Sequence, residues 1–243
     1  MEKYPKIYTI FKRDENNRKL VTPLINDQLE IKGLNLIRDI IVEEKVDGTN
    51  ACLLLGYDEK DIGFYWRYFS RNNEIREIDI MYIRDTLDKV VDFKLLEEWY
   101  LKNFVQMPKK DNNDTYFPEI RIFGEVYGDK IQKTNYLPKG ERDFVVFDIK
   151  INQSWLSIKV RNEICRNLNL KIVPKICILD RFPSFEECYN LLAVKYPKSI
   201  VAEKNGLEMY LEGFILRPKI NLYVAPNRRI LGKIKRKDFN LDI

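Results

Sequence analysis

The stretch Glu43-Glu44-Lys45-Val46-Asp47-Gly48-Thr49-Asn50 decides how this sequence is interpreted. Two β-prone runs, residues 39–45 and 51–56, flank its turn, and Asp47-Gly48 is a turn signal between them. A lysine at the end of a strand, followed by a tight polar turn, can project its amine into a pocket whose floor is backbone. Taken alone, a Lys-x-Asp-Gly tetrapeptide is common by chance, so an exposed lysine in a hairpin is the simpler interpretation.

The composition limits the chemistry that such a lysine could join. The chain has 243 residues, of which 45% are hydrophobic and 33% charged, as in a folded globular protein with a real core. It contains no histidine, which excludes mechanisms that need an imidazole base, nucleophile or metal ligand. The cysteines form no CxxC pair, so we expect no structural zinc site. A catalyst built from this chain must use Lys, Arg, Asp, Glu and a hard metal such as Mg²⁺.

Charge and hydropathy indicate the partners and the compartment. The net charge of +5 favours an anionic partner, although a basic tail can also be a plain solvated face. The basic residues of that tail are Arg228, Arg229, Lys233, Lys235, Arg236 and Lys237. No apolar run approaches the roughly 20 residues of a membrane span, and the N-terminus is unlike a signal peptide. We expect no membrane partner and a cytoplasmic location, which for a viral or phage protein is the host cytoplasm.

The hydrophobic pattern predicts an α+β fold. Strands are expected at 62–70, 120–127, 143–151, 213–217 and 230–235. Helices are expected at 86–102, around 160–168 and at 184–194, where Ser184 and Glu187 form a capping box. Strands and helices do not alternate regularly, so we expect antiparallel sheets flanked by helices rather than a doubly wound sheet. No repeat or long linker divides the chain, which predicts one domain over residues 1–243.

Further segments follow the Lys45 stretch in a particular order. They are Ser70-Arg71, Phe123-Gly124-Glu125-Val126-Tyr127-Gly128, Asp143-Phe144-Val145-Val146-Phe147-Asp148-Ile149, Glu212-Gly213-Phe214-Ile215-Leu216-Arg217 and Lys233-Ile234-Lys235. Together with Lys45 they resemble the collinear motifs of the covalent nucleotidyltransferase superfamily, which contains DNA ligases, RNA ligases and mRNA capping enzymes. The resemblance runs from about Tyr4 to Phe239 and implies the nucleotidyltransferase ligase fold.

The residues after Gly48 indicate one branch of that superfamily. DNA ligases and capping enzymes usually carry arginine two positions after this glycine, whereas this chain has Thr49-Asn50. The pattern K-x-x-G-T-N is similar to the RNA ligase 2 branch, as are Ile131-Gln132-Lys133 and Arg142-Asp143-Phe144. Because the chain ends soon after Lys235, we expect no appended OB domain of the kind that DNA ligases and capping enzymes carry there.

The resemblance implies that Lys45 attacks the α-phosphorus of ATP and becomes a lysyl-AMP. A free lysine has a pKa near 10.4, so the site must lower it, and burial or nearby cations would do so. Lys233 and Lys235 could supply those cations and neutralise the phosphates. Alternation places both on one face of a strand. On its own, a Lys-x-Lys pair in a basic tail is surface charge.

Three acidic residues are implied in the same site. Glu125 would bind the AMP ribose, or orient the lysine or the metal; otherwise it is a solvent-facing strand residue. Glu212 would engage the ribose or a Mg²⁺ or Mn²⁺ ion, largely through water, as suits a hard carboxylate. Glu44, which precedes the lysine, is counted with the ATP-binding and AMP-binding residues.

Three further residues are implied to contact the nucleotide. Phe147 would stack on adenine, although an ordinary core phenylalanine is a serious alternative. Arg71 would contact the transferred phosphate, unless it is a surface arginine at a strand end. Asn50 would contact the α-phosphate or the nucleic-acid 3′ end, unless it is only a turn residue.

The leading hypothesis is therefore an ATP-dependent RNA ligase acting on RNA ends that carry a 5′-phosphate and a 3′-hydroxyl. We expect a monomer, with an accessory protein or an end-healing enzyme as a second partner. A DNA ligase or a capping guanylyltransferase is one alternative, and whether ATP or GTP labels the protein distinguishes them. A nucleic-acid-binding relative that has lost catalysis is another, but Lys45, Glu125, Glu212, Lys233 and Lys235 are all intact.

Overall fold

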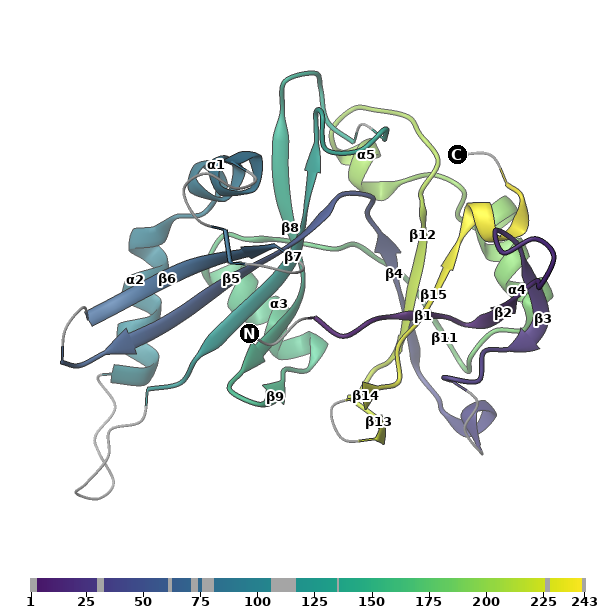
Figure 1. Ribbon diagram of the computed structural model, residues 1–243, viewed down its shortest axis with the longest axis horizontal. Helices are drawn as coiled ribbons and strands as arrows, with labels where there is room; N and C mark the ends of the chain where they lie inside the picture. Colours follow the sequence, from purple (N-terminus) through teal and green to yellow (C-terminus); the bar gives the residue numbers. More distant parts are fainter. Residues whose placement is uncertain are drawn as a thin grey trace. The chain divides into compact units, whose positions relative to one another are not determined.

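The computed structural model divides the chain into two compact units, each of which mixes strands with helices (Figure 1). It describes residues 4–29, 33–60, 63–70, 74–75, 81–105, 117–134, 136–225 and 228–241. Unit 1 comprises Met1–Tyr4, Gly48–Gln132 and Glu141–Ile172, and unit 2 comprises Pro5–Asp47, Lys133–Gly140 and Val173–Ile243. Most strand pairs in both units are antiparallel, so the expected α+β class with antiparallel sheets and helices is confirmed.

Unit 1 is built on a six-stranded sheet in the order β10-β8-β7-β5-β6, with β9 paired to β8. Its strands are β5 (Thr49–Asp58), β6 (Gly63–Ser70), β7 (Ile120–Gly128), β8 (Arg142–Ile151), β9 (Ser154–Trp155) and β10 (Lys171–Ile172). Successive side chains of β5 enter different cores: Leu53 and Leu55 pack against the helices, whereas Cys52 and Leu54 pack with Phe123. This period of two places apolar side chains on both faces of the sheet.

The helices of unit 1 share the Leu53 side of the sheet. They are α1 (Met81–Val90), α2 (Phe93–Tyr100), which continues into a π-helical turn at Leu101–Val105, and α3 (Ile158–Asn167). The sequence pattern predicts one helix over 86–102, but the structure has two, divided before α2. Asp92 caps α2 there, because its side chain accepts the Leu95 N–H at 3.0 Å. Aspartate favours the N-cap over a helix interior, which explains the break.

Unit 2 holds a five-stranded sheet in the order β1-β15-β12-β4-β11. Its strands are β1 (Tyr8–Thr9), β4 (Ile40–Lys45), β11 (Lys175–Leu179), β12 (Gly213–Pro218) and β15 (Gly232–Lys235). Two separate two-stranded sheets pair β2 (Phe11–Arg13) with β3 (Val21–Ile25) and β13 (Tyr223–Ala225) with β14 (Arg228–Arg229). The core of this unit includes Ile40, Val42, Phe214 and Ile234 from the sheet.

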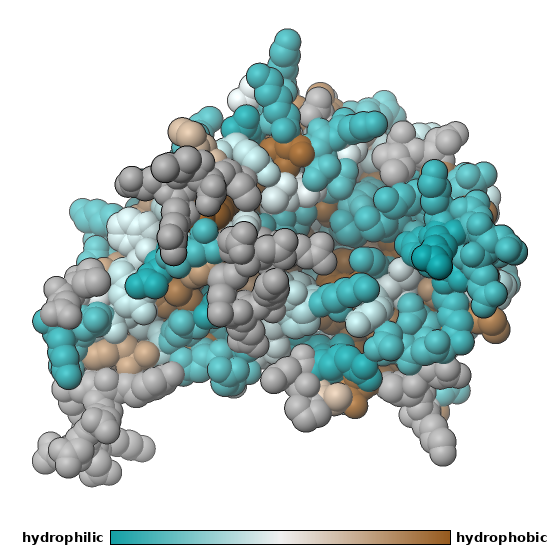
Figure 2. Space-filling model, viewed as in Figure 1, coloured by the Kyte–Doolittle hydropathy of each residue, from teal (hydrophilic) through white to brown (hydrophobic). Residues whose placement is uncertain are grey.

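Short helices complete unit 2. They are α4 (Phe185–Asn190), its π-helical continuation Leu191–Lys195, α5 (Ile200–Lys204) and two 3-10 turns, Leu34–Leu36 and Arg236–Phe239. The predicted capping box of α4 is present, since Ser184 and Glu187 each bond to the other's backbone N–H. In the described part of the chain, no helix is long and apolar enough to cross a membrane. The described hydrophobic residues that reach the face in Figure 2 form small areas among hydrophilic ones.

Candidate active site

One end of the unit 2 sheet brings together the lysines and the glutamate that the sequence singles out. Lys45 is the last residue of β4 and Lys235 the last of β15, while β12 runs antiparallel between them. The first residue of β12, Gly213, lies opposite both lysines in the strand register. Glu212, immediately before it, therefore enters the sheet between the two lysines.

Glu212 is shared by these two lysines. The Lys45 Nζ donates to one carboxylate oxygen of Glu212 and the Lys235 Nζ donates to the other. The glutamate side chain is 5% exposed, against 21% for Lys45 and 16% for Lys235. Burial alone would raise the pKa of Glu212, but the two ammonium groups outweigh it and hold that pKa below its ordinary value. The carboxylate is thus ionised at neutral pH, and both lysine amines are held at one point.

Gly213 permits this approach of the strands. A Cβ at this position would collide with the Ile234 carbonyl group and the Lys235 Cα. Only glycine lets the backbones come so close without a shift. The glycine after Glu212 therefore helps to set the Glu212–Lys235 contact.

Lys233 lies on the same face of β15 as Lys235, as alternation predicts, while Ile234 between them is buried in the unit 2 core. Burial, together with the charges of Lys235 and Lys45, lowers the pKa of Lys233 to about 8. The site thus depresses the pKa of Lys233. The structure pairs the Lys45 amine with Glu212. The expected lowering of the Lys45 pKa stays a prediction.

Glu44 points away from Lys45, because neighbouring residues of a strand face opposite sides. Its carboxylate accepts hydrogen bonds from the Ser199 Oγ and from the backbone N–H groups of Ile200 at 3.0 Å and Val201 at 3.2 Å. Burial raises the pKa of Glu44 in spite of these donors. The side chain that the sequence assigns to the nucleotide therefore engages the first turn of α5, where backbone N–H groups need acceptors.

A second contact holds the chain on the other side of Lys45. The Asp47 N–H donates to the Tyr136 hydroxyl at 3.0 Å, and the Thr134 hydroxyl donates to the Asp47 carboxylate at 2.6 Å. Tyr136 is fully buried, and its carbonyl accepts from the Asn205 amide at 3.2 Å, directly after α5. The backbone around Lys45 is thus fixed at both Glu44 and Asp47. Sequence reasoning missed Tyr136 and Asn205, since no local motif marks such long-range contacts.

Asn50 and Glu125 lie in unit 1, directly opposite each other on β5 and β7. Gly48 allows this pairing, because a Cβ there would collide with the Val126 carbonyl and the Glu125 side chain. One of the points where the chain passes between the units falls between Asp47 and Gly48. Arg71, the predicted phosphate contact, lies outside the residues that the structure describes.

Phe147 occupies a β-bulge. In the β7–β8 ladder, Phe123 pairs with Asp148 and Gly124 pairs with Val146, so Phe147 is the extra residue between them. Bulges redirect a side chain, and the half-buried Phe147 lies at the margin of an aromatic cluster rather than deep in the core. The ring of Tyr4 meets it edge-on, with 5.0 Å between centroids.

Arg161 supports the bulge from α3. Its side chain is buried, and its Nη1 donates to the Phe147 carbonyl at 2.6 Å. Its Nε and Nη2 donate to the Asn162 side chain at 2.9 and 2.8 Å. A buried carbonyl displaced from the ladder needs such a donor. Arg161 is a second residue that the sequence pattern did not mark.

The donor sets fit a nucleotide and a metal that retains its water. Lys45, Lys233 and Lys235 suit phosphate oxygens, since lysine ammonium groups bind phosphate as point charges. Among the described residues, no group of three or more Cys, Asp or Glu could hold a metal ion by itself. Glu212 is a single carboxylate, so it fits a Mg²⁺ or Mn²⁺ ion whose other ligands are waters and phosphate oxygens.

The chain is similar to solved structures of the RNA ligase of Naegleria gruberi. The form with PPi shares 15% identity over 96% of this chain and 61% of that chain, with a TM-score of 0.56. An apo variant shares 18% over 97% and 62%, with a TM-score of 0.56, and a variant with ATP and Mn shares 18% over 83% and 50%, with a TM-score of 0.55. At these identities the likeness shows the fold alone.

This chain spans between 50% and 62% of the length of those three ligase structures. A search of curated proteins found no match. The family model for RNA ligase, however, matches residues 38–235, from the strand that carries Lys45 to Lys235 itself. Since this match covers most of the sequence, the chain belongs to the RNA ligase family.

Proposed function

We propose that this chain is an ATP-dependent RNA ligase that carries AMP on Lys45. The convergence of Lys45, Lys235 and Glu212 at one sheet end is the observation that carries the proposal. Two amines held on one buried carboxylate offer a nucleophile next to a cation for phosphate. Family membership supports RNA ends as the substrate class, and the ATP in structures of the Naegleria ligase supports the nucleotide.

In the first step, the deprotonated Lys45 Nζ attacks the α-phosphorus of ATP. A P–N bond forms, the bond from the α-phosphorus to the bridging oxygen breaks, and pyrophosphate leaves. Lys45 must first leave its ion pair with Glu212 and lose a proton. Lys235 and Lys233 then lie where they can offset the negative charge of the phosphates.

In the second step, an oxygen of the RNA 5′-phosphate attacks the phosphorus of the lysyl-AMP. A 5′–5′ pyrophosphate linkage forms and Lys45 is released. In the third step, the 3′-hydroxyl of the other end loses its proton and attacks the 5′-phosphate phosphorus. A phosphodiester forms and AMP leaves, so each P–O or P–N bond that breaks is replaced by one that forms.

Four further residues would recognise the nucleoside and the ends. Phe147 would stack on adenine, Glu125 would bind the ribose hydroxyls, and Asn50 and Arg71 would contact phosphate. A bound Mg²⁺ or Mn²⁺, held largely through water at Glu212, would supply positive charge at the phosphates. Because the family match crosses both units, we propose that they belong to one nucleotidyltransferase domain.

The setting of the enzyme is also proposed. We infer a cytoplasmic monomer, or a viral protein in host cytoplasm, that seals 5′-phosphate and 3′-hydroxyl RNA ends. An accessory or end-healing protein would supply such ends.

The test is covalent labelling by the nucleotide. The purified protein is incubated with Mg²⁺ or Mn²⁺ and with α-labelled ATP or GTP, then run on a denaturing gel. Lys45→Ala is the test variant. Lys219→Ala is the matched control, since Lys219 is an exposed lysine that pairs with Asp39 elsewhere in unit 2.

Label from ATP that disappears only in Lys45→Ala supports the proposal. Label from GTP alone would move the assignment to capping. Absence of label with both metals would overturn it, provided that mass spectrometry finds no AMP already on the untreated protein. Joining of labelled RNA compared with DNA then establishes the strand type.

A further inference from the structure

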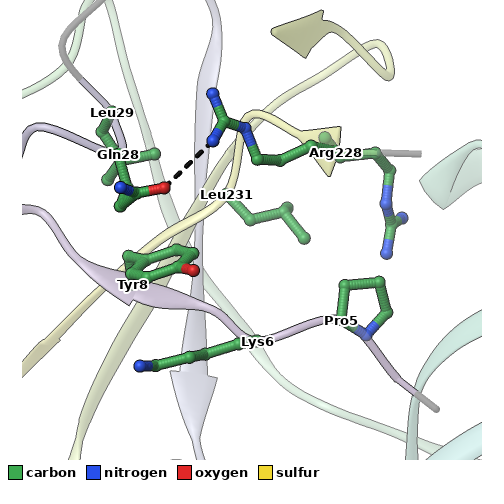
Figure 3. A pocket seen from close by; sticks show the side chains of 8 residues that line it. Pro5, Lys6, Tyr8, Gln28, Leu29, Arg228 and Leu231 are labelled. Carbon is green, nitrogen blue, oxygen red and sulfur yellow. Dashed lines mark hydrogen bonds between the residues drawn. The ribbon is translucent and has the colours of Figure 1, made fainter. Parts of the chain in front are cut away.

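Strand β15 loses its partner on one side next to Lys235. β1 runs parallel to β15, and Thr9 at the end of β1 lies opposite Lys233. Tyr8, before it, packs on the core side of the sheet, where it lines a small hollow (Figure 3). The Ile10 N–H still donates to the Lys233 carbonyl at 3.0 Å. Beyond this bond, the open side of β15 needs another partner.

The carboxylate of Asp238 takes the place of that partner. In a continued parallel ladder, the Lys235 N–H would donate to the Ile10 carbonyl. That carbonyl instead accepts the Asn26 N–H at 2.8 Å. The Lys235 N–H donates to the Asp238 Oδ2 at 3.0 Å, and the Asp238 side chain is fully buried. Because a buried backbone N–H needs an acceptor, Asp238 holds the backbone that carries the Lys235 amine.

Arg13 holds the other oxygen of this carboxylate. Its Nη2 donates to the Asp238 Oδ1 at 2.7 Å. Its Nη1 donates to the carbonyls of Arg18 and Lys19, at 2.9 and 3.0 Å, in the turn that joins β2 to β3. The planar guanidinium holds these three oxygens at fixed positions, which a single ammonium group cannot do. Arg13 and Asp238 therefore connect the β2–β3 turn to the backbone of Lys235.

The positive charge of Arg13 offsets the negative charge of the buried carboxylate. Burial and the charges of Lys235 and Lys45 lower the pKa of Lys233, and Asp238 acts on that pKa in the opposite direction. An unpaired carboxylate here would attract the lysine amines and compete with a phosphate for them. Paired with Arg13, Asp238 can accept the Lys235 N–H while the amines stay available to the nucleotide.

We propose that Asp238 and Arg13 are positioning residues that hold the backbone of Lys235 while its amine contacts a phosphate of ATP. The inference rests on the proposed function for the identity of the nucleotide. The residue after Lys235 is also fixed, because the Arg236 N–H donates to the Glu212 carbonyl at 3.0 Å. Only the side chain of Lys235 then has to move when the nucleotide arrives. Such preorganisation favours binding, since little conformational freedom is left to lose.

The test measures nucleotide binding without transfer of AMP. Calorimetry follows the binding of α,β-methylene-ATP with Mg²⁺, because the carbon in place of the bridging oxygen prevents charging of Lys45. Pyrophosphate and Mg²⁺ first remove any AMP on the protein by reversing the first proposed step. The test variant is Asp238→Asn, whose amide has one oxygen to accept from both Lys235 and Arg13. It is made with Lys235 present and with Lys235→Met, and thermal unfolding verifies that each protein is folded.

The two backgrounds separate positioning from a general loss of stability. With Lys235 present, Asp238→Asn should weaken binding of the analogue about fivefold, as expected for loss of one hydrogen bond. With Lys235→Met, the same substitution should weaken binding less than about twofold, because the residue through which it acts is gone. Equal losses in the two backgrounds, or no loss in either, would overturn the proposal.

Arg13→Lys tests the same connection from its less buried end. It keeps the charge but cannot hold all three oxygens, so analogue binding should weaken about threefold. Arg181→Lys is the matched control, since Arg181 donates to the Phe182 carbonyl at 3.2 Å and to the Glu187 carboxylate at 2.9 and 3.1 Å. The control should stay within about twofold of the parent. Equal affinities in Arg13→Lys and the control would contradict the role of Arg13.

The double variant shows whether Arg13 acts through Asp238. Added to Asp238→Asn, Arg13→Lys should weaken binding no further, because both changes break one connection. A further loss would mean that Arg13 contacts the nucleotide itself, and would overturn its positioning role. If Asp238→Asn does not fold, Arg13→Lys is compared in the two Lys235 backgrounds, and the same pattern of losses decides.

Failure here is distinct from failure of the proposed function. The binding assay involves no covalent step, whereas the labelling assay depends on one. A chain that labels on Lys45 but shows equal losses in the two Lys235 backgrounds retains its ligase assignment and loses only this role. A parent protein that neither labels nor binds the analogue would overturn both.

Discussion

The Tyr136 hydroxyl is a small group whose removal tests whether the backbone around Lys45 is held for catalysis. Tyr136→Phe deletes one oxygen from a fully buried side chain and leaves no large cavity. It also removes the acceptor of the Asp47 N–H, two residues after Lys45. Burial raises the pKa of Tyr136 far above its ordinary value, so the hydroxyl is neutral at every usable pH.

The expected loss of stability is modest. A hydrogen bond of this kind contributes about 1 kcal/mol, and Asp47 is only half-buried, so water can replace part of it. For a chain of this size the midpoint of thermal unfolding should fall by about 2–4 °C. A protein with an ordinary stability of about 5–15 kcal/mol remains folded after this loss. Any large fall in activity would therefore come from the site and not from unfolding.

The expected loss of rate is larger. A displacement of about 1 Å at a reacting group can cost about 100-fold. We therefore expect labelling of Lys45 at saturating ATP to slow by about 10- to 100-fold. The ATP concentration for half-maximal rate should change little, because Tyr136 does not lie among the residues proposed to bind the nucleotide.

Single-turnover labelling with rapid quenching measures both quantities. The control is Tyr100→Phe in unit 1, which removes a hydroxyl that donates to the Pro118 carbonyl at 2.6 Å from another fully buried tyrosine. It should lose similar stability and keep the labelling rate. A Tyr136→Phe rate within about twofold of the parent, or an equal loss in Tyr100→Phe, would refute positioning through Asp47.

Three further changes test other parts of the site. Arg161→Lys keeps the charge but loses the guanidinium fork under the Phe147 bulge, so half-maximal labelling should need about 5–10 times more ATP, equivalent to about 1 kcal/mol of binding. Arg166→Lys on the exposed side of the same helix is the control. An unchanged ATP concentration for half-maximal labelling in Arg161→Lys would contradict a role of Arg161 in supporting Phe147. Glu212→Gln should lower stability by about 3–5 kcal/mol at neutral pH, because it leaves two lysines without their buried partner. Since the pKa of Glu212 is lowered on folding, its contribution to stability is present above the ordinary pKa of 4.5 and is lost as pH falls through the pKa of the folded protein. Urea titrations should therefore show that the stability difference between Glu212→Gln and the parent shrinks in acid. A stability difference independent of pH would contradict this. Lys233, with its pKa of about 8, should take up a proton when ATP binds at pH 8. Calorimetry in buffers of different ionisation enthalpy detects this uptake, and Lys233→Met should abolish it. Proton uptake by Lys233→Met equal to that of the parent would exclude Lys233 as its source.

The sequence was sufficient for features that depend on local pattern. Alternation placed Lys233 and Lys235 on one face, and Ser184 with Glu187 marked the start of α4. The order of motifs indicated the family that the comparisons then established. These features follow from neighbours a few residues apart, or from motifs whose order along the chain is fixed.

Features that depend on distant partners could not be predicted. Glu44 is 155 residues from Ser199, and its role at α5 follows only from strand β4 meeting that helix. The Phe147 bulge depends on one extra residue in β8 relative to β7, which alternation in either strand does not reveal. Asp92 is a favoured N-cap residue, but the apolar stripe in the sequence continues across it and favours one helix.

The charges of the unit 2 cluster favour an anionic ligand over a purely structural role. Lys45 and Lys235 share Glu212, and Lys233 adds a third cation whose pKa is depressed by burial and by the other two. Asp238, the other carboxylate acting on Lys233, already pairs with Arg13. A cluster with more positive than negative charge is costly to bury, and apolar residues would make a more stable sheet end. A polyphosphate would supply the missing negative charge, and the same charge would compete with Glu212 for Lys235 and free Lys45 from its resting ion pair.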